Sequence, residues 1–221
     1  MDCDMGGVPG EGGTEPEAWV TELERRRASR LDRLFRGVKL RVDDRECLAV
    51  VRDASPYGLR LRLYHGLPEH RRLAIELANG ECHPLQLVWH NGDNAGVFFV
   101  EPIDYEAFLR ALNERGVPAD VVRVGPMRRH LRVNVHREGY LRAGGSADPV
   151  VLNDISQGGA CITCNAWLSL AQPVTVDAAP FPHLEARVRW RDHPRYGLAV
   201  TPVLAFDELA RLVAASAGFP P

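Results

Sequence analysis

Hydrophobic and polar residues alternate along much of this chain in short runs. Residues 131–142 read LRVNVHREGYLR, and the short apolar runs PVVLNDIS, GACITC, PVTVDA and HLEARVRW follow them. Turn-forming segments separate these runs, among them GGSADP, SQGG and AAPFP. A period of two with frequent turns is typical of antiparallel strands that bury one face. We therefore expect a mainly β protein.

The same organisation occurs twice, at a fixed offset of 101 positions. The segments VVRDASPYG and VLNDISQGG share an acid, a serine and a glycine at equal spacing, so that Asp53, Ser55 and Gly58 recur as Asp154, Ser156 and Gly159. Two further landmarks recur at this offset, Trp89 as Trp190 and Gly96 as Gly197. Several landmarks at one offset without gaps indicate two copies of one module of about a hundred residues, the size of a small domain.

Each copy is expected to form a six-stranded antiparallel β-barrel followed by a C-terminal α-helix. About six short strands per copy favour a closed barrel, because closure removes exposed strand edges. Apolar residues recur at helical spacing in 103–115 and 204–215, and these helices would cap a barrel end or the interface between the barrels. An additional N-terminal helix is expected where Thr14 and Glu17 match a capping box.

Composition sets the limits of the chain's organisation. Its 221 residues are 45% hydrophobic and 25% charged, which is typical of globular domains. We expect a disordered tail at 1–16, a first domain at 17–118 that includes the N-terminal helix, and a second domain at 119–221. The sequence contains neither an apolar run of about 18 residues nor a signal-peptide pattern, which predicts a cytoplasmic protein without membrane insertion. The formal net charge of −2 argues against coating nucleic acid by bulk charge.

The second copy carries a distinctive set of polar residues where a strand is interrupted. The arginines Arg128 and Arg132 precede the barrel, and Asp154, Ser156 and Gly159 follow within it. Guanidinium groups bind phosphates and the guanine edge, a carboxylate accepts hydrogen bonds from guanine N–H groups, and glycine allows close approach. The set therefore suits an anionic ligand that contains guanine. The alternative interpretation is an Asx-turn followed by a hairpin corner.

The spacing RxxxR followed by [DN]xSxxG resembles the PilZ domain family over roughly residues 126–216. Both motifs are complete in the second copy: Arg128, Arg132, Asp154, Ser156 and Gly159. The resemblance implies a bacterial, non-enzymatic receptor for cyclic di-GMP, often with two stacked ligand molecules per domain and no cofactor. In that family the arginine segment wraps the phosphates and guanines, while the [DN]xSxxG turn contacts a guanine. Many members are switches in which the arginine segment orders on binding and moves a neighbouring domain.

The first copy is similar to the family at Asp53, Ser55 and Gly58. Its arginine pair would be Arg26 and Arg30, because RRASR matches RRHLR with one residue of gap. The turn differs, with Pro and Tyr where the second copy has Gln and Gly. The arginines also continue a stretch of helical character, for which a solvated helix face is the alternative interpretation. Whether the first domain binds ligand therefore stays open.

Other functions fit the sequence less well. The main alternative is a degenerate PilZ adaptor that regulates motility, pili or polysaccharide through protein contacts without ligand. Cys161 and Cys164 would face opposite sides of a strand, and no second ligand pair completes a metal site. Neither a nucleophile–base set for an enzyme nor a row of aromatic residues for RNA binding is evident; Trp89 and Trp190 are expected to fill barrel cores or rims. The downstream protein partner and the oligomeric state, a homodimer included, stay open.

Overall fold

The structure is a computed structural model that describes residues 34–113 and 131–220. Both barrels and both DxSxxG segments lie within these ranges. Several predictions lie outside the described residues: the tail, the N-terminal helix, and the arginines Arg26, Arg30 and Arg128.

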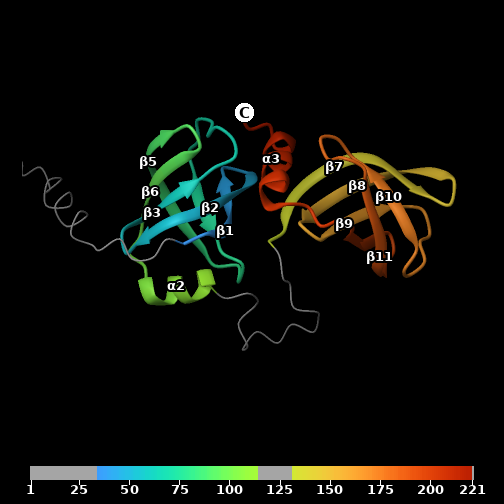
Figure 1. The fold of residues 1–221 in the computed structure, drawn as a ribbon, viewed down its shortest axis with the longest axis horizontal. Coiled ribbons are helices and arrows are strands. Elements are labelled where there is room, and N and C mark those ends of the chain that lie inside the picture. The colour runs from blue at the N-terminus through green and yellow to red at the C-terminus, as the bar shows by residue number, and fades with distance from the viewer. Residues whose placement is uncertain (1–33, 114–130, 221) are drawn as a thin grey trace, which may run out of the picture.

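The first barrel contains six strands: β1 (Arg36–Val42), β2 (Arg45–Ser55), β3 (Gly58–Arg62), β4 (Leu73–Glu76), β5 (Cys82–Asn91) and β6 (Asn94–Phe99). The second contains β7 (Val133–Ala143), β8 (Ser146–Ser156), β9 (Gly159–Cys164), β10 (Pro173–Asp177), β11 (Leu184–Asp192) and β12 (Arg195–Val200). Their orders, β1-β2-β3-β6-β5-β4 and β7-β8-β9-β12-β11-β10, are the same once the repeat is applied (Figure 1). The predicted pair of closed six-stranded antiparallel barrels is confirmed.

The two barrels also share their irregularities. Register shifts occur at corresponding places, between Val51 and Asp53, between Leu152 and Asp154, between Leu87 and Trp89, and between Val188 and Trp190. A β-bulge adds a residue to one strand and re-aims the side chains beside it. Each motif acid and each recurring tryptophan thus follows a bulge, so that the repeat extends from sequence to local geometry.

An ion-pair network interrupts the simple alternation of β1. Val38 and Leu40 point into the core and are at most 1% exposed, yet Lys39 between them is also buried. The Lys39 ammonium lies 3.2 Å from a Glu46 carboxylate oxygen in β2 and 2.8 Å from one of Glu76 in β4. Lys39 is the only lysine of the chain. Paired carboxylates offset the cost of burying its charge.

The helices that follow the barrels occupy different places. Helix α2 (Tyr105–Asn113) begins at an N-cap, because Asp104 accepts the backbone N–H of Ala107 at 2.9 Å. Its Phe108 packs edge-to-face on Phe99 and closes one end of the first barrel. Helix α3 (Phe206–Ser216) instead lies between the two barrels (Figure 1). The sequence prediction offered both locations, and each helix takes one of them.

Helix α3 is buried on two sides. Leu209 and Val213 belong to the core of the second barrel, whereas Ala214 and the following Phe219 belong to the core of the first. Conversely, Leu48 of β2 is fully buried in the cluster of the second barrel. The barrels therefore share a continuous apolar contact.

Polar contacts tie the segment after α3 to the first barrel. The Phe219 ring lies between the Arg45 guanidinium, 4.7 Å from its centroid, and the His65 imidazole, whose centroid is 4.5 Å away. The Gly66 N–H donates to the Pro220 carbonyl at 2.8 Å. Burial lowers the pKa of His65, which therefore favours the neutral ring in this contact.

Replacing Phe219 by alanine tests this anchor. Loss of a buried aromatic ring leaves a cavity, so we expect Phe219→Ala to lower the free energy of unfolding by about 3 kcal/mol in urea denaturation. Phe35→Ala is the matched control, because Phe35 is 64% exposed and its loss should cost about 0.5 kcal/mol or less. Equal losses for the two variants would contradict the packing of Phe219 into the core of the first barrel.

Candidate ligand-binding site

The DxSxxG segment of the second barrel forms a tight hairpin. Ser156 ends β8 and pairs with Gly159 at the start of β9, so that Gln157 and Gly158 form a two-residue turn. The Ser156 hydroxyl donates to the Gly159 carbonyl at 3.1 Å and is buried. The hairpin corner is therefore present as the alternative interpretation had it, whereas the Asp154 carboxylate bonds Arg132 instead of closing an Asx-turn. The strand stops and resumes because it turns back on itself, and the serine hydroxyl holds the turn.

Asp154 lies on the outside of the barrel beside this hairpin. Its carboxylate accepts a charge-assisted hydrogen bond from the Arg132 guanidinium, and the exposed fractions of the two side chains are 20% and 28%. The same guanidinium extends over Gly159, where an added Cβ would lie 3.4 Å from Nη2. Arg132 is thus brought together with the predicted acid and glycine, at the opening of β7.

Gly159 is required by close packing. A Cβ at this position would lie 3.1 Å from the backbone carbonyl of Leu198 in β12 as well as against Arg132. The neighbouring Gly158 has far more room, since the nearest atom, on Val203, would be 3.8 Å away. The absence of a side chain at Gly159 therefore allows both the β12 backbone and the Arg132 guanidinium to approach the hairpin.

Cross-strand pairing continues the site around the barrel. Asn134 pairs with Asp154, Asp154 with Cys161, Cys161 with Gly197, and Gly197 with Trp190. We call these five residues the site row. It runs from β7 to β11. Sequence reasoning singled out only Asp154 as a ligand contact within it.

The tryptophan at the end of the site row lies flat on its glycine. A Cβ on Gly197 would be 1.9 Å from the Trp190 indole nitrogen, and one on Gly96 would be 2.2 Å from that of Trp89. The indoles are 41% and 44% exposed, so they lie on the outer surface and do not fill the barrel cores. In the sequence, the only signal for this contact was that the tryptophan and the glycine recur together at the offset of 101.

A second arginine approaches the site row from β12. Arg195 points its guanidinium at the buried thiol of Cys161, with Nη2 3.8 Å from Sγ. The pKa of Arg195 is raised, mainly by this hydrogen bond and further by the nearby charge of Asp154. Because arginine is common in this chain, nothing in the sequence distinguished Arg195.

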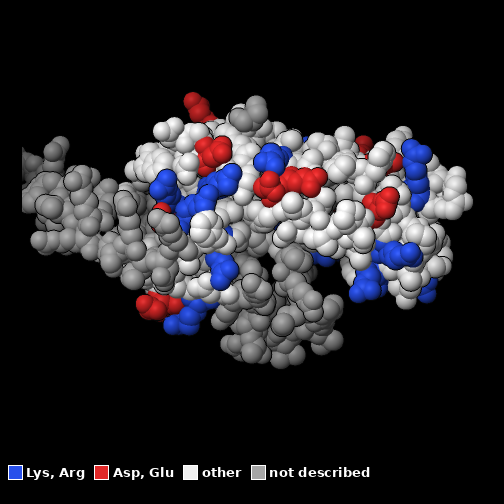
Figure 2. Space-filling view, in the orientation of Figure 1, with Lys and Arg blue, Asp and Glu red and all other residues white. Residues whose placement is uncertain are grey.

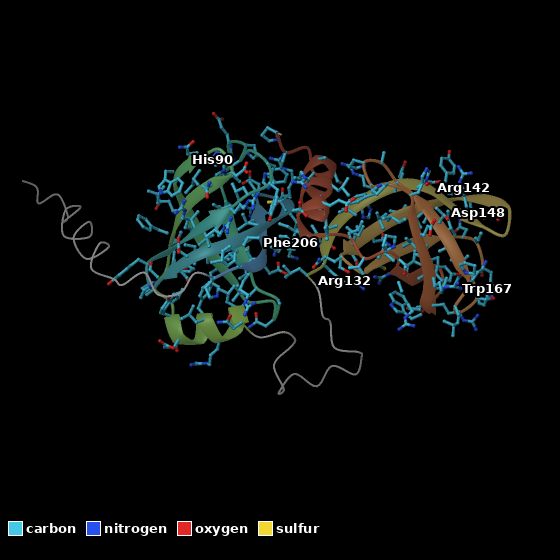
Figure 3. The ribbon with its side chains drawn as sticks, in the orientation of Figure 1. His90, Arg132, Arg142, Asp148, Trp167 and Phe206 are labelled. Carbon is cyan, nitrogen blue, oxygen red and sulfur yellow. The ribbon has the colours of Figure 1, made fainter. Side chains whose placement is uncertain are left out.

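Arg132, which pairs with Asp154 of the site row, lies toward the junction between the barrels. Figure 3 places Arg132 at the end of the second barrel nearest the first, whereas Arg142 and Trp167 lie at the far end. Figure 2 shows acidic and basic side chains interspersed over the face in view, with no extended surface of one sign. Recognition of an anion here would depend on individual guanidinium groups.

Comparison with known families identifies the second barrel. The PilZ domain model matches residues 126–215, a range that includes both the arginine segment and the hairpin. This part of the chain is a PilZ domain. No curated protein matches the chain.

Solved structures similar to this chain include two complexes with c-di-GMP and an inhibitor of motility. PlzA of Borreliella burgdorferi in complex with c-di-GMP is 13% identical, with coverage of 84% of this chain and 88% of that one and a TM-score of 0.34. YcgR of Escherichia coli in complex with c-di-GMP is 15% identical, with coverage of 89% and 88% and a TM-score of 0.34. The Bacillus subtilis inhibitor of motility MotI/DgrA is 11% identical, with coverage of 81% and 93% and a TM-score of 0.32.

The first barrel repeats the hairpin of the PilZ domain, with an additional arginine beside its acid. Ser55 pairs with Gly58, and its hydroxyl donates to the Gly58 carbonyl at 3.1 Å. The Asp53 carboxylate lies 3.9 Å from the guanidinium of Arg60, its cross-strand neighbour. The residue at the position of Arg60 in the PilZ domain is Cys161. The acid of the first hairpin thus has an arginine partner within its own sheet.

Neither a metal site nor a membrane-spanning helix is found in the part of the chain that the structure describes. Within residues 34–113 and 131–220, no three His, Cys, Asp or Glu side chains gather as metal ligands would. Across the same ranges no helix is both long and apolar enough to cross a bilayer.

The packing at the hairpin predicts different outcomes for its two glycines. Gly159→Ala should lower the free energy of unfolding by about 1–3 kcal/mol, because the added methyl overpacks the contact with β12. Gly158→Ala should be close to neutral, because its methyl meets only ordinary van der Waals distances. Thermal unfolding of both variants checks this; a Gly158 variant as unstable as the Gly159 variant would contradict the assignment.

Proposed function

We propose that this protein is a receptor for cyclic di-GMP and that its PilZ domain binds the dinucleotide at Arg128, Arg132, Asp154, Ser156 and Gly159. The observation that carries the proposal is the juxtaposition of Arg132, Asp154 and Gly159 on one hairpin of a PilZ domain. A guanidinium there supplies paired donors for a phosphate, and the carboxylate supplies acceptors for a guanine edge.

Each residue has a role that follows from its surroundings. Asp154 is partly exposed, so its carboxylate is accessible to a guanine once Arg132 turns from it to a phosphate. Ser156 is buried, and its hydroxyl holds the turn that shapes the binding site. The exposed indole of Trp190 and the guanidinium of Arg195 add a stacking surface and a second cation to the same row.

The receptor is expected to act by binding alone, in the cytoplasm of a bacterium, on a downstream protein partner. A rearrangement of the barrels on binding stays a prediction. Such a movement would have to break the contacts of α3 and Leu48 with the opposite barrel or carry them along. Superimposable small-angle scattering curves with and without ligand would contradict it.

Arg132→Ala tests the proposed site. Charge-assisted contacts are worth about 1.5–3 kcal/mol each, so the variant should bind cyclic di-GMP at least tenfold more weakly in titration calorimetry. Arg142→Ala is the matched control, because Arg142 belongs to β7, which follows Arg132, but pairs with Asp177 at 3.0 Å at the far end of the barrel. Unchanged binding by the Arg132 variant, or no binding by the unmodified protein, would favour the ligand-free adaptor.

The first domain is proposed to lack a working site, because its turn has Pro56 and Tyr57 in place of Gln and Gly, and because Asp53 faces Arg60 where the PilZ domain has a cysteine. Asp154→Ala should therefore abolish most of the measured binding, whereas Asp53→Ala should leave both affinity and stoichiometry unchanged. The same titration reports both quantities. A reduced stoichiometry in the Asp53 variant would mean that the first domain binds ligand as well, through the predicted Arg26 and Arg30 with Asp53, Ser55 and Gly58.

A further inference from the structure

The backbone that carries Arg132 has little support from its own barrel. Strand β7 begins at Val133, and only Val133 and Asn134 pair with β8 before the register shifts. The shift extends to Arg137 and includes His136, whose φ of 48° is rare for a residue with a side chain. Two ladder pairs followed by a bulge therefore connect Arg132 to the rest of the strand.

The first barrel supplies additional support at this point. Glu46 of β2 accepts the backbone N–H of Asn134 at 2.9 Å with one carboxylate oxygen. Its other oxygen accepts the Asn134 side-chain amide at 3.0 Å. One carboxylate thus holds both donors of the residue that pairs with Asp154 and lies two positions after Arg132. Hydrogen bonds to an ionised acceptor are stronger than neutral ones.

Glu46 is itself held in place within the first barrel. The buried ammonium of Lys39 bridges it to Glu76, and Glu76 lies 3.8 Å from the Arg41 guanidinium. Two cations and two carboxylates balance in this network. The Glu46 side chain is only 12% exposed, so its orientation toward Asn134 is set by packing and by Lys39.

We infer that Glu46 is a positioning residue of the ligand site, contributed to the PilZ domain by the first barrel. By fixing Asn134, it holds the opening of β7 so that Arg132 stays over the Asp154–Gly159 hairpin. The inference rests on the proposed binding of cyclic di-GMP at that hairpin. It gives the first barrel a part in binding without a ligand of its own.

Electrostatics and positioning predict opposite effects of removing this carboxylate. A negative charge near the site disfavours an anionic ligand, so that loss of the charge alone would tighten binding. Loss of the positioning contact would weaken it. Weaker binding without the carboxylate therefore indicates that Glu46 positions the site. Unchanged or tighter binding indicates that Glu46 has no role in binding or opposes it.

The experiment is calorimetric titration of cyclic di-GMP into the full chain and three variants. We expect Glu46→Ala to bind about tenfold more weakly than the unmodified protein, and Arg132→Ala at least as weakly. Glu76→Ala is the matched control, because it removes the other carboxylate partner of Lys39 but does not contact Asn134. It should bind within about twofold of the unmodified protein.

Hydrogen exchange without ligand gives a second, independent readout. The Asn134 amide should exchange faster in Glu46→Ala than in Glu76→Ala, because only the former loses its acceptor. Glu46→Gln serves in both measurements if the alanine variant fails to fold. It keeps one acceptor but turns an N–H group toward the Asn134 amide, and a weakening of several-fold is expected.

The outcomes separate the two claims. If the unmodified protein binds and Arg132→Ala does not, but Glu46→Ala binds as well as or better than Glu76→Ala, the role of Glu46 is overturned and the proposed function stands. If the unmodified protein does not bind, or Arg132→Ala binds normally, the proposed function falls and the inference with it.

Discussion

The packing of helix α3 between the barrels is the contact on which the arrangement of this molecule depends. The helix belongs to the PilZ domain by sequence, and Leu209 and Val213 complete the core of that domain. Its other face, with Ala214, and the following Phe219 complete the core of the first barrel. Because apolar burial on both sides opposes separation, the relative position of the barrels is set by the same helix that stabilises each of them.

This arrangement explains why the candidate site lies where the barrels meet. The PilZ hairpin, the Arg132–Asp154 pair and the start of β7 are at the end of the second barrel that faces the first. Glu46 reaches the same place from β2. If a ligand orders the arginine segment, the change would thus act directly on the first barrel through the contact of Asn134 with Glu46. A short polar route of this kind needs no large rearrangement to transmit binding.

The fold was predictable from the sequence because its signals are local and repeated. The period-two alternation of apolar residues predicts the strands. One offset relates the two hairpins, which predicts that the two barrels are similar. The motif hairpin and the proximity of Arg132 to Asp154 were likewise expected from spacing and from the resemblance to PilZ domains. The pairing of Arg60 with Asp53 in the first copy was not predicted, because it depends on the antiparallel register of β2 and β3.

The remaining features depend on contacts between distant elements. The alanines of α3 do not indicate that both faces of the helix are buried. Alanine favours helix formation whether its position is buried or exposed. The contact between Glu46 and Asn134 depends on the relative placement of two barrels, which strand periodicity does not encode. Of the two places expected for Trp190, a barrel core or a rim, its exposure excludes the core, and its contact with Gly197 across the strands was not predicted.

The most direct test of this account is hydrogen exchange of the full chain with and without cyclic di-GMP, resolved by segment. The account predicts ligand-dependent protection at 131–134 and 153–161 and at the start of β2 around Glu46. The corresponding hairpin of the first barrel, 53–60, should be unchanged. Protection of 53–60, or no protection of the PilZ hairpin at a saturating ligand concentration, would contradict a single ligand site at the junction of the two barrels.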